Sequence, residues 1–298
     1  MAQKRIGFSF SGGGIKAYAQ LGIVRYLNEQ GIYATGFSGT SMGSIVAALM
    51  ACGLDIDAVE TAMLEIEQEI IKHKLFNPTN AQFFPLILKD ASGLIKPHRF
   101  VEILSKQLAK CNKTRLKDLS YPIIINAVDL NSGKIVLFTN RKERFKNHAE
   151  YLVFDDALIV EAVQASCSFP MVFETMMWRD LQLVDGGVAL NAPVLPLKQI
   201  GFDHILSITM GIRSDYHTTT KIKDIASRVV EIVINEADAN AIKHAALNIN
   251  AFDKNIGIFT LGKGKDAIEL GYRVASEHHD DIMKFKENAQ QSFWDLFK

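Results

Sequence analysis

The chain has 298 residues, of which 48% are hydrophobic, and its 33 basic and 33 acidic side chains give a formal net charge of +0. This composition predicts a globular protein with a large core and argues against a disordered, collagen-like or disulfide-scaffold protein. Balanced charge without long runs of one sign argues against nucleic acid as a partner. Because Cys52, Cys111 and Cys167 are far apart and outside any metal-ligand spacing, we expect buried, reduced thiols in a reducing compartment.

The N-terminus carries no secretory signal pattern, because its charged residues are followed by a short strand and then glycines. The longest apolar run, Ile45 to Leu54, is about half of the ~20 residues that a membrane-spanning helix needs. We therefore expect a cytoplasmic protein whose membrane contact is peripheral. The sequence leaves the oligomeric state unknown.

Strand-like and helix-like patterns alternate from the N-terminus: a strand at Ile6–Phe10, a helix from about Ile15 to Gln30, a strand at Tyr33–Phe37 and a helix from about Met42. This alternation is typical of an α/β protein with a parallel sheet and helices on its faces. Further strands are expected at Pro122–Val128, Lys134–Thr139, Gln182–Val184 and His204–Thr209, and helices at Asp57–His73, His98–Lys110, Asp156–Ala165, Asp224–Asn248 and Ala275–Phe297.

Two segments have more than one interpretation. The irregular region His73 to Pro97, with Phe83, Phe84, Leu86, Ile87 and Leu88, is either a lid or binding surface over an acyl channel or a packed connection. In the C-terminal segment, residues 282, 285, 289, 293 and 296 form an apolar stripe. Docking on the core explains this stripe, and a membrane-surface helix is the alternative.

A glycine loop follows the first expected strand. Gly12, Gly13 and Gly14 let backbone N–H groups turn toward one point, and the helix that follows adds its positive N-terminal dipole. Such a loop suits a bound phosphate or a transient oxyanion, although it can also be an ordinary tight turn. The dinucleotide-binding spacing fails because Ala17 stands where its third glycine would be, and no P-loop lysine follows.

The motif G-x-S-x-G occurs at Gly39–Gly43, between a strand-like run and a small-residue helix. In this context it predicts a nucleophile elbow, in which Ser41 sits in a strained turn with its hydroxyl exposed above the sheet. A glycine-rich turn without catalytic function is the alternative. Since a serine hydroxyl is a poor nucleophile until a base takes its proton, the chain must supply a base.

Asp185 is the candidate base, because it follows an expected strand and precedes Gly186 and Gly187. An Asp-Gly turn stabilised by its own side chain is an equally common explanation of this pattern.

Together these motifs resemble the patatin-like phospholipase family, in its bacterial type. The matching segments are Gly12-Gly13-Gly14-Ile15-Lys16, Gly39–Gly43, Asp185-Gly186-Gly187 and Ala165–Pro170, which is similar to the family's A-S-x-x-x-P stretch. The resemblance covers about the first 200 residues. It implies a three-layer sandwich with a mostly parallel central sheet flanked by helices. It also implies a single patatin-like domain over 1–298, with a motif-bearing core at about 5–210 and a C-terminal helical part at about 211–298.

The resemblance implies a Ser-Asp dyad. Ser41 would attack the ester carbonyl, Asp185 would act as general base and then as general acid, and the amides of the glycine loop would form the oxyanion hole. Lys16 would hold the loop or bind an anionic head group, unless it is a solvated helix charge. Ala17 replaces a glycine that is usual in the family, which puts the shape of the loop in doubt. This chemistry requires no metal or cofactor.

The resulting expectation is a lipid acyl hydrolase of the phospholipase A or lysophospholipase type, acting on lipid at a membrane or micelle surface. Two alternatives stay open. One is a conventional esterase with a Ser-Asp-His triad, for which the histidines after the acid are His204, His217, His244, His278 and His279. The other is a non-catalytic module that binds a phosphorylated ligand with the glycine loop.

Overall fold

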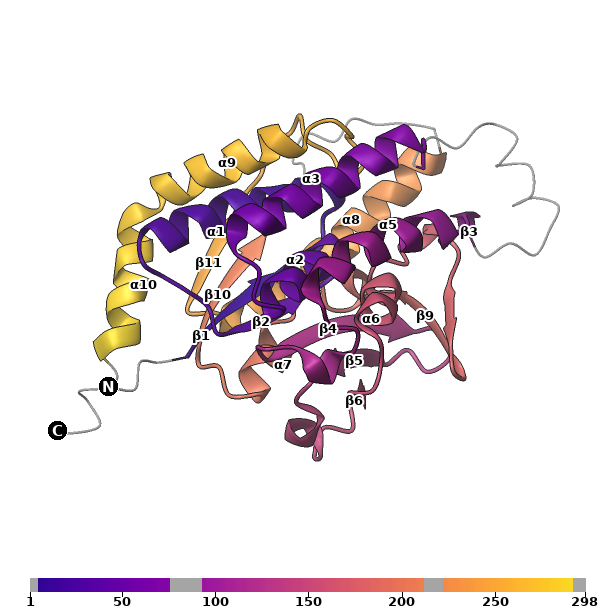
Figure 1. Cartoon of the computed structure of the whole chain (residues 1–298), viewed down its shortest axis with the longest axis horizontal. Coiled ribbons are helices and arrows are strands. Elements are labelled where there is room, and N and C mark those ends of the chain that lie inside the picture. Colours follow the sequence, from indigo (N-terminus) through magenta and orange to yellow (C-terminus); the bar gives the residue numbers. More distant parts are fainter. Residues whose placement is uncertain (1–4, 76–92, 212–221, 292–298) are drawn as a thin grey trace.

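The computed structural model describes residues 5–75, 93–211 and 222–291 (Figure 1). The first part of the chain forms β1 (Ile6–Phe10), a 3-10 turn (Gly14–Tyr18), α1 (Ala19–Glu29), β2 (Gly36–Gly39), α2 (Met42–Ala51) and α3 (Ile56–Lys72). The middle forms β3 (Gly93–Ile95), α5 (His98–Leu108), β4 (Ile123–Asp129), β5 (Ile135–Thr139), β6 (Tyr151–Phe154) and α6 (Ile159–Ser166). The remainder forms β7 (Met171–Phe173), β8 (Met176–Trp178), β9 (Leu181–Asp185), α7 (Val194–Gln199), β10 (His204–Thr209), α8 (Ile222–Ala241), β11 (Leu247–Asn250), α9 (Gly264–Glu277) and α10 (His279–Gln291).

A mostly parallel sheet forms the centre of the molecule, in the order β11-β10-β1-β2-β4-β5-β6. The pairs from β11 to β4 are parallel, whereas β5 and β9 both run antiparallel to β4. Strands β1, β2, β4 and β10 are buried along their whole length, which is why the sequence shows them as continuous apolar or small-residue runs. The expected fold class, a three-layer sandwich around such a sheet, is confirmed.

Strands β2 and β9 share one edge of β4 and approach each other from opposite ends. Gly39 of β2 pairs with Ile125, and Asp185 of β9 pairs with Ala127, two residues further along β4. The other edge of β4 is taken by β5. Because β2 is parallel and β9 antiparallel to β4, the end of one strand is directed at the end of the other. This arrangement brings the G-x-S-x-G and D-G-G motifs together.

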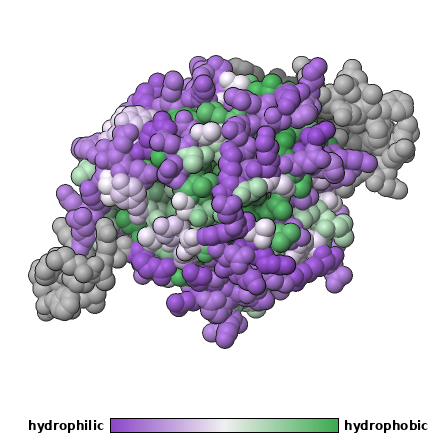
Figure 2. Space-filling model, in the orientation of Figure 1, coloured by the Kyte–Doolittle hydropathy of each residue, from purple (hydrophilic) through white to green (hydrophobic). Residues whose placement is uncertain are grey.

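Helices cover both faces of the sheet. Figure 1 shows α1, α2, α3, α5 and α9 gathered on one side of the sheet and α7 on the other. Two buried clusters match these layers: the larger contains Leu21, Leu49 and Ile66 from α1, α2 and α3, and the smaller contains Val194 and Leu197 from α7. On the face seen in Figure 2, hydrophilic side chains predominate, with smaller hydrophobic groups between them.

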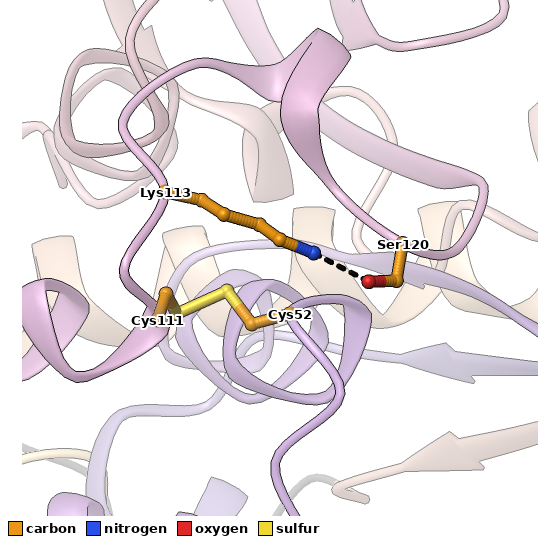
Figure 3. The surroundings of a disulfide bond; sticks show 4 residues. All are labelled: Cys52, Cys111, Lys113 and Ser120. Carbon is orange, nitrogen blue, oxygen red and sulfur yellow. Dashed lines mark hydrogen bonds between the residues drawn. A yellow bond between two sulfur atoms is a disulfide. The ribbon is translucent and has the colours of Figure 1, made fainter.

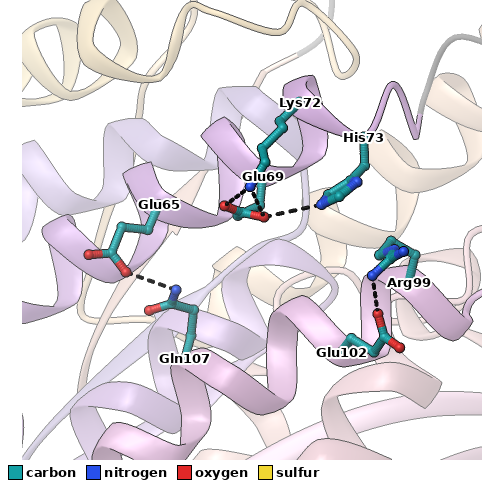
Figure 4. Close-up of polar contacts among 7 residues, drawn as sticks. All are labelled: Glu65, Glu69, Lys72, His73, Arg99, Glu102 and Gln107. Carbon is teal, nitrogen blue, oxygen red and sulfur yellow. Dashed lines mark hydrogen bonds and ion pairs between the residues drawn. The ribbon is translucent and has the colours of Figure 1, made fainter.

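Polar contacts join α3 and α5 at the surface (Figure 4). Glu65 accepts hydrogen bonds from Gln107 Nε2 and from Lys110 Nζ, both at 2.9 Å. At the end of α3, Glu69 forms an ion pair with Lys72 at 3.1 Å, and His73 Nε2 lies 3.2 Å from the same carboxylate. Surface ion pairs contribute little to stability, so the buried apolar surface dominates the packing of these helices.

The C-terminal part differs from its prediction. The helix expected to reach Asn248 ends at Ala241, and Leu247–Asn250 adds β11 to the sheet, so this part is not wholly helical. Sequence patterns did not predict α9, which packs on α1. The stripe of Ile282, Phe285 and Ala289 is buried, so its expected docking on the core is confirmed, while residues 293 and 296 lie outside the described part.

The cysteine prediction was wrong for two of the three residues. Cys52, which follows α2, forms a disulfide with Cys111, which follows α5, with their Cα atoms 5.4 Å apart (Figure 3). The pair is separated by 59 positions, and no sequence pattern shows that the two helix ends meet. Cys167 is free and buried. A persistent disulfide is typical of an oxidising compartment, so it conflicts with the expectation of reduced thiols.

In the described ranges, every helix is too short or too polar to span a bilayer.

Candidate active site

The motifs meet in a pocket at the carboxyl ends of β1, β2 and β10, where ligands of open α/β sheets usually bind. Its empty volume is about 900 Å³, including the part open to solvent. The apolar side chains that line it come from elements throughout the chain: Ile15, Met42, Ile70, Phe100, Phe169, Phe173, Met210, Ile234, Ile258, Phe259 and Leu261. Ser41, Asp185, Lys16, Asn191 and Asp238 supply its polar groups, together with the glycine loop.

Ser41 lies in a strained turn between β2 and α2, with φ 52° and ψ −128°. Residues other than glycine rarely adopt this conformation. The flanking glycines allow the turn to be tight: a Cβ on Gly39 would lie 2.3 Å from the Gly43 carbonyl oxygen, and one on Gly43 would lie 2.5 Å from that of Ser11. This geometry is that of a nucleophile elbow, with the N-terminus of α2 directed at the serine.

Buried hydrogen bonds hold the elbow in place. The Ser41 amide donates to Ser166 Oγ at 2.8 Å, so the A-S-x-x-x-P segment positions the turn. The Thr40 hydroxyl donates to Asn126 Oδ1 at 2.7 Å, and Asn126 Nδ2 donates to the Leu190 carbonyl at 2.7 Å. This chain of contacts links the elbow through β4 to the loop that follows Asp185.

Asp185 is buried at the end of β9, beside Ser41. Its Oδ1 accepts the Gly187 amide at 2.8 Å, and its own amide donates to the Ser168 carbonyl at 2.9 Å. Burial raises the pKa of Asp185 to about 7, although the Gly187 amide and the Ser41 hydroxyl each lower it by hydrogen bonding. Among the described residues, none forms a well-aligned hydrogen bond with Oδ2. The structure therefore brings together the two residues that the sequence predicts as nucleophile and base.

The glycine loop lies against Ser41, but its three amides are not equivalent. Gly12 donates its N–H to Asn191 Oδ1 at 2.9 Å, so this amide is already used. Gly13 and Gly14 precede the intrahelical bonds of the 3-10 turn, and their amides donate to no other described residue. Gly14 has φ 58°, and a Cβ there would lie 2.2 Å from the Ile258 carbonyl oxygen. Of the three amides that the sequence analysis proposes as oxyanion donors, those of Gly13 and Gly14 are therefore more available than that of Gly12.

Lys16 is only 9% exposed, which excludes its interpretation as a solvated helix charge. Its Nζ donates to the carbonyls of Gly211 at 3.0 Å and Met210 at 3.5 Å, just after β10. The side chain therefore ties the glycine loop to the end of a neighbouring strand while also lining the pocket.

Asn191 and Asp238 are polar pocket residues that the sequence analysis did not single out. Asn191 Nδ2 donates to Asp238 Oδ2 at 2.8 Å. Burial raises the pKa of Asp238 to about 7, and the Asn191 hydrogen bond and the charge of Lys16 lower it. The position of Asn191, six residues after Asp185, was an available signal, whereas Asp238 lies on a helix where a carboxylate would ordinarily be solvated.

Cys167 also lines the pocket, with a buried thiol. Burial, with a smaller contribution from the charge of Asp185, raises its pKa well above the usual value for a thiol. Burial therefore keeps this thiol in its neutral form near pH 7.

No histidine of the described ranges lines the pocket. His204 opens β10, at the opposite end of the strand from the pocket, where it stacks on Phe285 and makes a 2.7 Å contact with the Phe285 carbonyl. His217 lies outside the described residues, as do the aromatic and aliphatic residues 83–88 expected to line or cover the site. Within the described ranges, histidine, cysteine and carboxylate side chains form no cluster suited to a metal ion.

Comparisons with known proteins place the chain among its relatives. The sequence profile of the family described as Patatin-like phospholipase matches residues 8–198. The chain is 24% identical to the uncharacterized protein YqhO of Bacillus subtilis, over 83% of this chain and 84% of that protein. It is 23% identical to lysophospholipase NTE1 of Chaetomium globosum, over 71% of this chain but only 12% of that protein. Among solved structures, it resembles VipD of Legionella pneumophila with 14% identity and a TM-score of 0.48, over 96% of this chain and 67% of that chain.

Proposed function

Because the chain belongs to the patatin-like phospholipase family, we propose that it hydrolyses carboxylic esters of fatty acyl lipids through a dyad of Ser41 and Asp185. The observation that carries this proposal is the strained turn of the half-buried Ser41, which lines the pocket beside the buried carboxyl of Asp185. Strain of this kind persists where the surrounding structure enforces it, and it is typical of catalytic residues.

In the first half-reaction, Ser41 Oγ attacks the ester carbonyl while Asp185 takes the hydroxyl proton. The carbonyl oxygen becomes an oxyanion, which accepts hydrogen bonds from the amides of Gly13 and Gly14. Each such donor is worth roughly 3 kcal/mol of transition-state stabilisation. Asp185 then gives the proton to the leaving alkoxide, and the acyl group stays on Ser41 as an ester.

In the second half-reaction, water replaces the leaving group. Asp185 removes a proton from the water as it attacks the acyl carbonyl, and then returns the proton to Ser41 Oγ as the fatty acid departs. A pKa of about 7 suits both steps, since the same carboxyl group must accept and donate a proton near neutral pH.

The pocket supports a long-chain acyl substrate. Phe100, Phe169, Phe173 and Leu261 offer an apolar environment for an acyl chain next to Ser41. Lys16 lines the same pocket, and we assign it the support of the glycine loop, with contact to an anionic head group as a further role. The curated relative described as a lysophospholipase supports the phospholipase A or lysophospholipase type.

Mass spectrometry of products from a mixed lipid extract tests the proposal. The intact protein is expected to release fatty acids, and Ser41→Ala is expected to release none beyond the no-enzyme background. Ser105→Ala, which changes an exposed serine of α5, is the matched control and is expected to behave like the unchanged protein. Equal fatty acid release by Ser41→Ala would reject the proposal.

The two alternative functions make different predictions. A Ser-Asp-His triad requires a histidine, so it predicts that His217→Gln abolishes turnover, whereas the dyad predicts that this variant retains it. His204→Gln should retain turnover in either case, because His204 lies at the end of β10 opposite the pocket. A binding module would bind inorganic phosphate equally well with or without the Ser41 hydroxyl and would release no fatty acid.

A further inference from the structure

A buried hydrogen-bonded chain connects α8 to the glycine loop. Asp238 Oδ2 accepts from Asn191 Nδ2 at 2.8 Å, and Asn191 Oδ1 accepts from the Gly12 amide at 2.9 Å. Asn191 is 2% exposed and Asp238 is 8% exposed, so water does not readily replace either contact. The chain of contacts joins segments that are 179 and 47 positions apart in the sequence.

The chain of contacts also fixes which way the Asn191 amide faces. An asparagine side chain can be turned over so that its oxygen and nitrogen exchange places. Here the Gly12 N–H requires an acceptor, so Asn191 Oδ1 faces Gly12 and Nδ2 is left to donate to the Asp238 carboxyl. Asp238 thereby holds Asn191 Oδ1 against the glycine loop.

Gly12 connects the Asn191–Asp238 pair to Ser41. A Cβ on Gly12 would lie 2.7 Å from Asn191 Oδ1 and 3.1 Å from Ser41 Cβ, so Gly12 is packed between the two side chains. Because the Gly12 amide faces Asn191, the amides of Gly13 and Gly14 remain available to the oxyanion. A shift of about 1 Å in such donors can cost roughly 100-fold in rate.

Resting on the proposed function, we infer that Asn191 and Asp238 are positioning residues that hold the Gly13 and Gly14 amides toward the oxyanion formed at Ser41. Neither side chain touches the reacting atoms, and both act through Gly12. Through Asp238, α8 takes part in positioning the loop, although α8 lies beyond residues 8–198 that match the family.

Steady-state kinetics on a soluble fatty acyl ester tests the inference. Asp238→Leu is expected to lower kcat about 10- to 100-fold with KM changed less than about 2-fold, because oxyanion donors act in the transition state. Asp238→Asn is expected to stay within about 3-fold of the original kcat, since its amide oxygen still accepts from Asn191. Glu236→Leu, which removes an exposed carboxylate from the same helix, is the matched control.

A polarity exchange separates positioning from general structural support. Asn191→Asp alone places two carboxyl groups against each other and is expected to lose most of kcat. In the double variant Asn191→Asp with Asp238→Asn, the amide at position 238 donates to the carboxylate at position 191, which also accepts from the Gly12 amide. The kcat of the double variant is therefore expected to be at least 10-fold higher than that of Asn191→Asp alone. Circular dichroism melts of each variant establish that the rates refer to folded protein.

The outcomes distinguish this inference from the proposed function. An unchanged kcat in folded Asp238→Leu, or no recovery in the folded double variant, overturns the positioning role. A raised KM with unchanged kcat also overturns it, because that result indicates contact with the substrate. The proposed function itself fails if Ser41→Ala retains turnover, which is a different result from those above.

Discussion

The hydroxyl of Ser41 stands beside the carboxyl group of Asp185, which already accepts the Gly187 amide at Oδ1 but has no well-formed hydrogen bond at Oδ2. Catalytic contacts are often loose without substrate and tighten in the complex. Sheet pairing places these two residues: β2 and β9 end two residues apart along the same edge of β4. Their proximity is thus a property of the sheet and not of one flexible loop.

Backbone strain at Ser41 gives the first prediction. Its φ of 52° and ψ of −128° are readily adopted by glycine, whereas alanine keeps the clash of a Cβ. We expect the free energy of unfolding of Ser41→Gly to be about 1 kcal/mol higher than that of Ser41→Ala, so that the glycine variant is the more stable one. This holds even though glycine gains more entropy when the chain unfolds. Urea denaturation of both inactive variants measures the difference. A less stable Ser41→Gly would mean that the turn is not strained.

The pH dependence of catalysis should report Asp185. Since the pKa of this group is about 7 and only its ionised form accepts a proton, kcat/KM is expected to rise about tenfold per pH unit below 7 and to level off above it. Asp238 has a similar pKa, so the measurement is repeated with Asp238→Asn, which should keep the same rise. A flat profile from pH 5 to 8 would exclude Asp185 as the base.

Removing the Asp185 charge should stabilise the fold at alkaline pH. With a pKa of about 7 in the folded protein and an ordinary value near 3.8 when unfolded, the folded state binds more protons between these values, so stability falls as pH rises from about 4 to 7. Asp185→Asn escapes this loss and should be roughly 2 to 4 kcal/mol more stable than the original protein at pH 8. Urea denaturation at pH 8 and pH 4 measures the gain, which should nearly vanish at pH 4. An equal gain at both values would rule out titration as its cause.

The disulfide should contribute substantially to stability. Cys52 and Cys111 close a loop of 59 positions, for which the loop-entropy relation gives about 4 kcal/mol. Replacing both residues by alanine is expected to lower the free energy of unfolding by about that amount. Dithiothreitol should destabilise the original protein similarly and leave the double variant unchanged. If the reductant does not affect the original protein, the bond is not formed in solution.

The elements and residues that the sequence predicted correctly have local signals. β1 and β10 are recognised by their apolar runs. The elbow at Ser41 is recognised by its two glycines, of which Gly39 lies against the backbone of Gly43, only four residues away. Asp185 was placed by the turn that follows it. Each of these patterns lies within a few consecutive residues, so it can be recognised in a single sequence.

The features that were missed depend on contacts between distant segments. β11 is a strand only because Leu206–Thr209 of β10 offers it a free edge, so its four residues appear as the end of a helix in the sequence. The Cys52–Cys111 bond requires α2 and α5 to end together. Asp238 is a buried partner of Asn191 only because α8 packs beside the pocket, and no local pattern reveals that burial.

The most direct test of the dyad is reaction with a fluorophosphonate that carries a long alkyl chain, followed by intact-mass and peptide mass spectrometry. The account predicts one adduct per molecule, located on Ser41, no adduct in Ser41→Ala, and labelling of Asp185→Asn slowed by at least 100-fold. An adduct on another residue, or equal labelling rates for the original protein and Asp185→Asn, would contradict it.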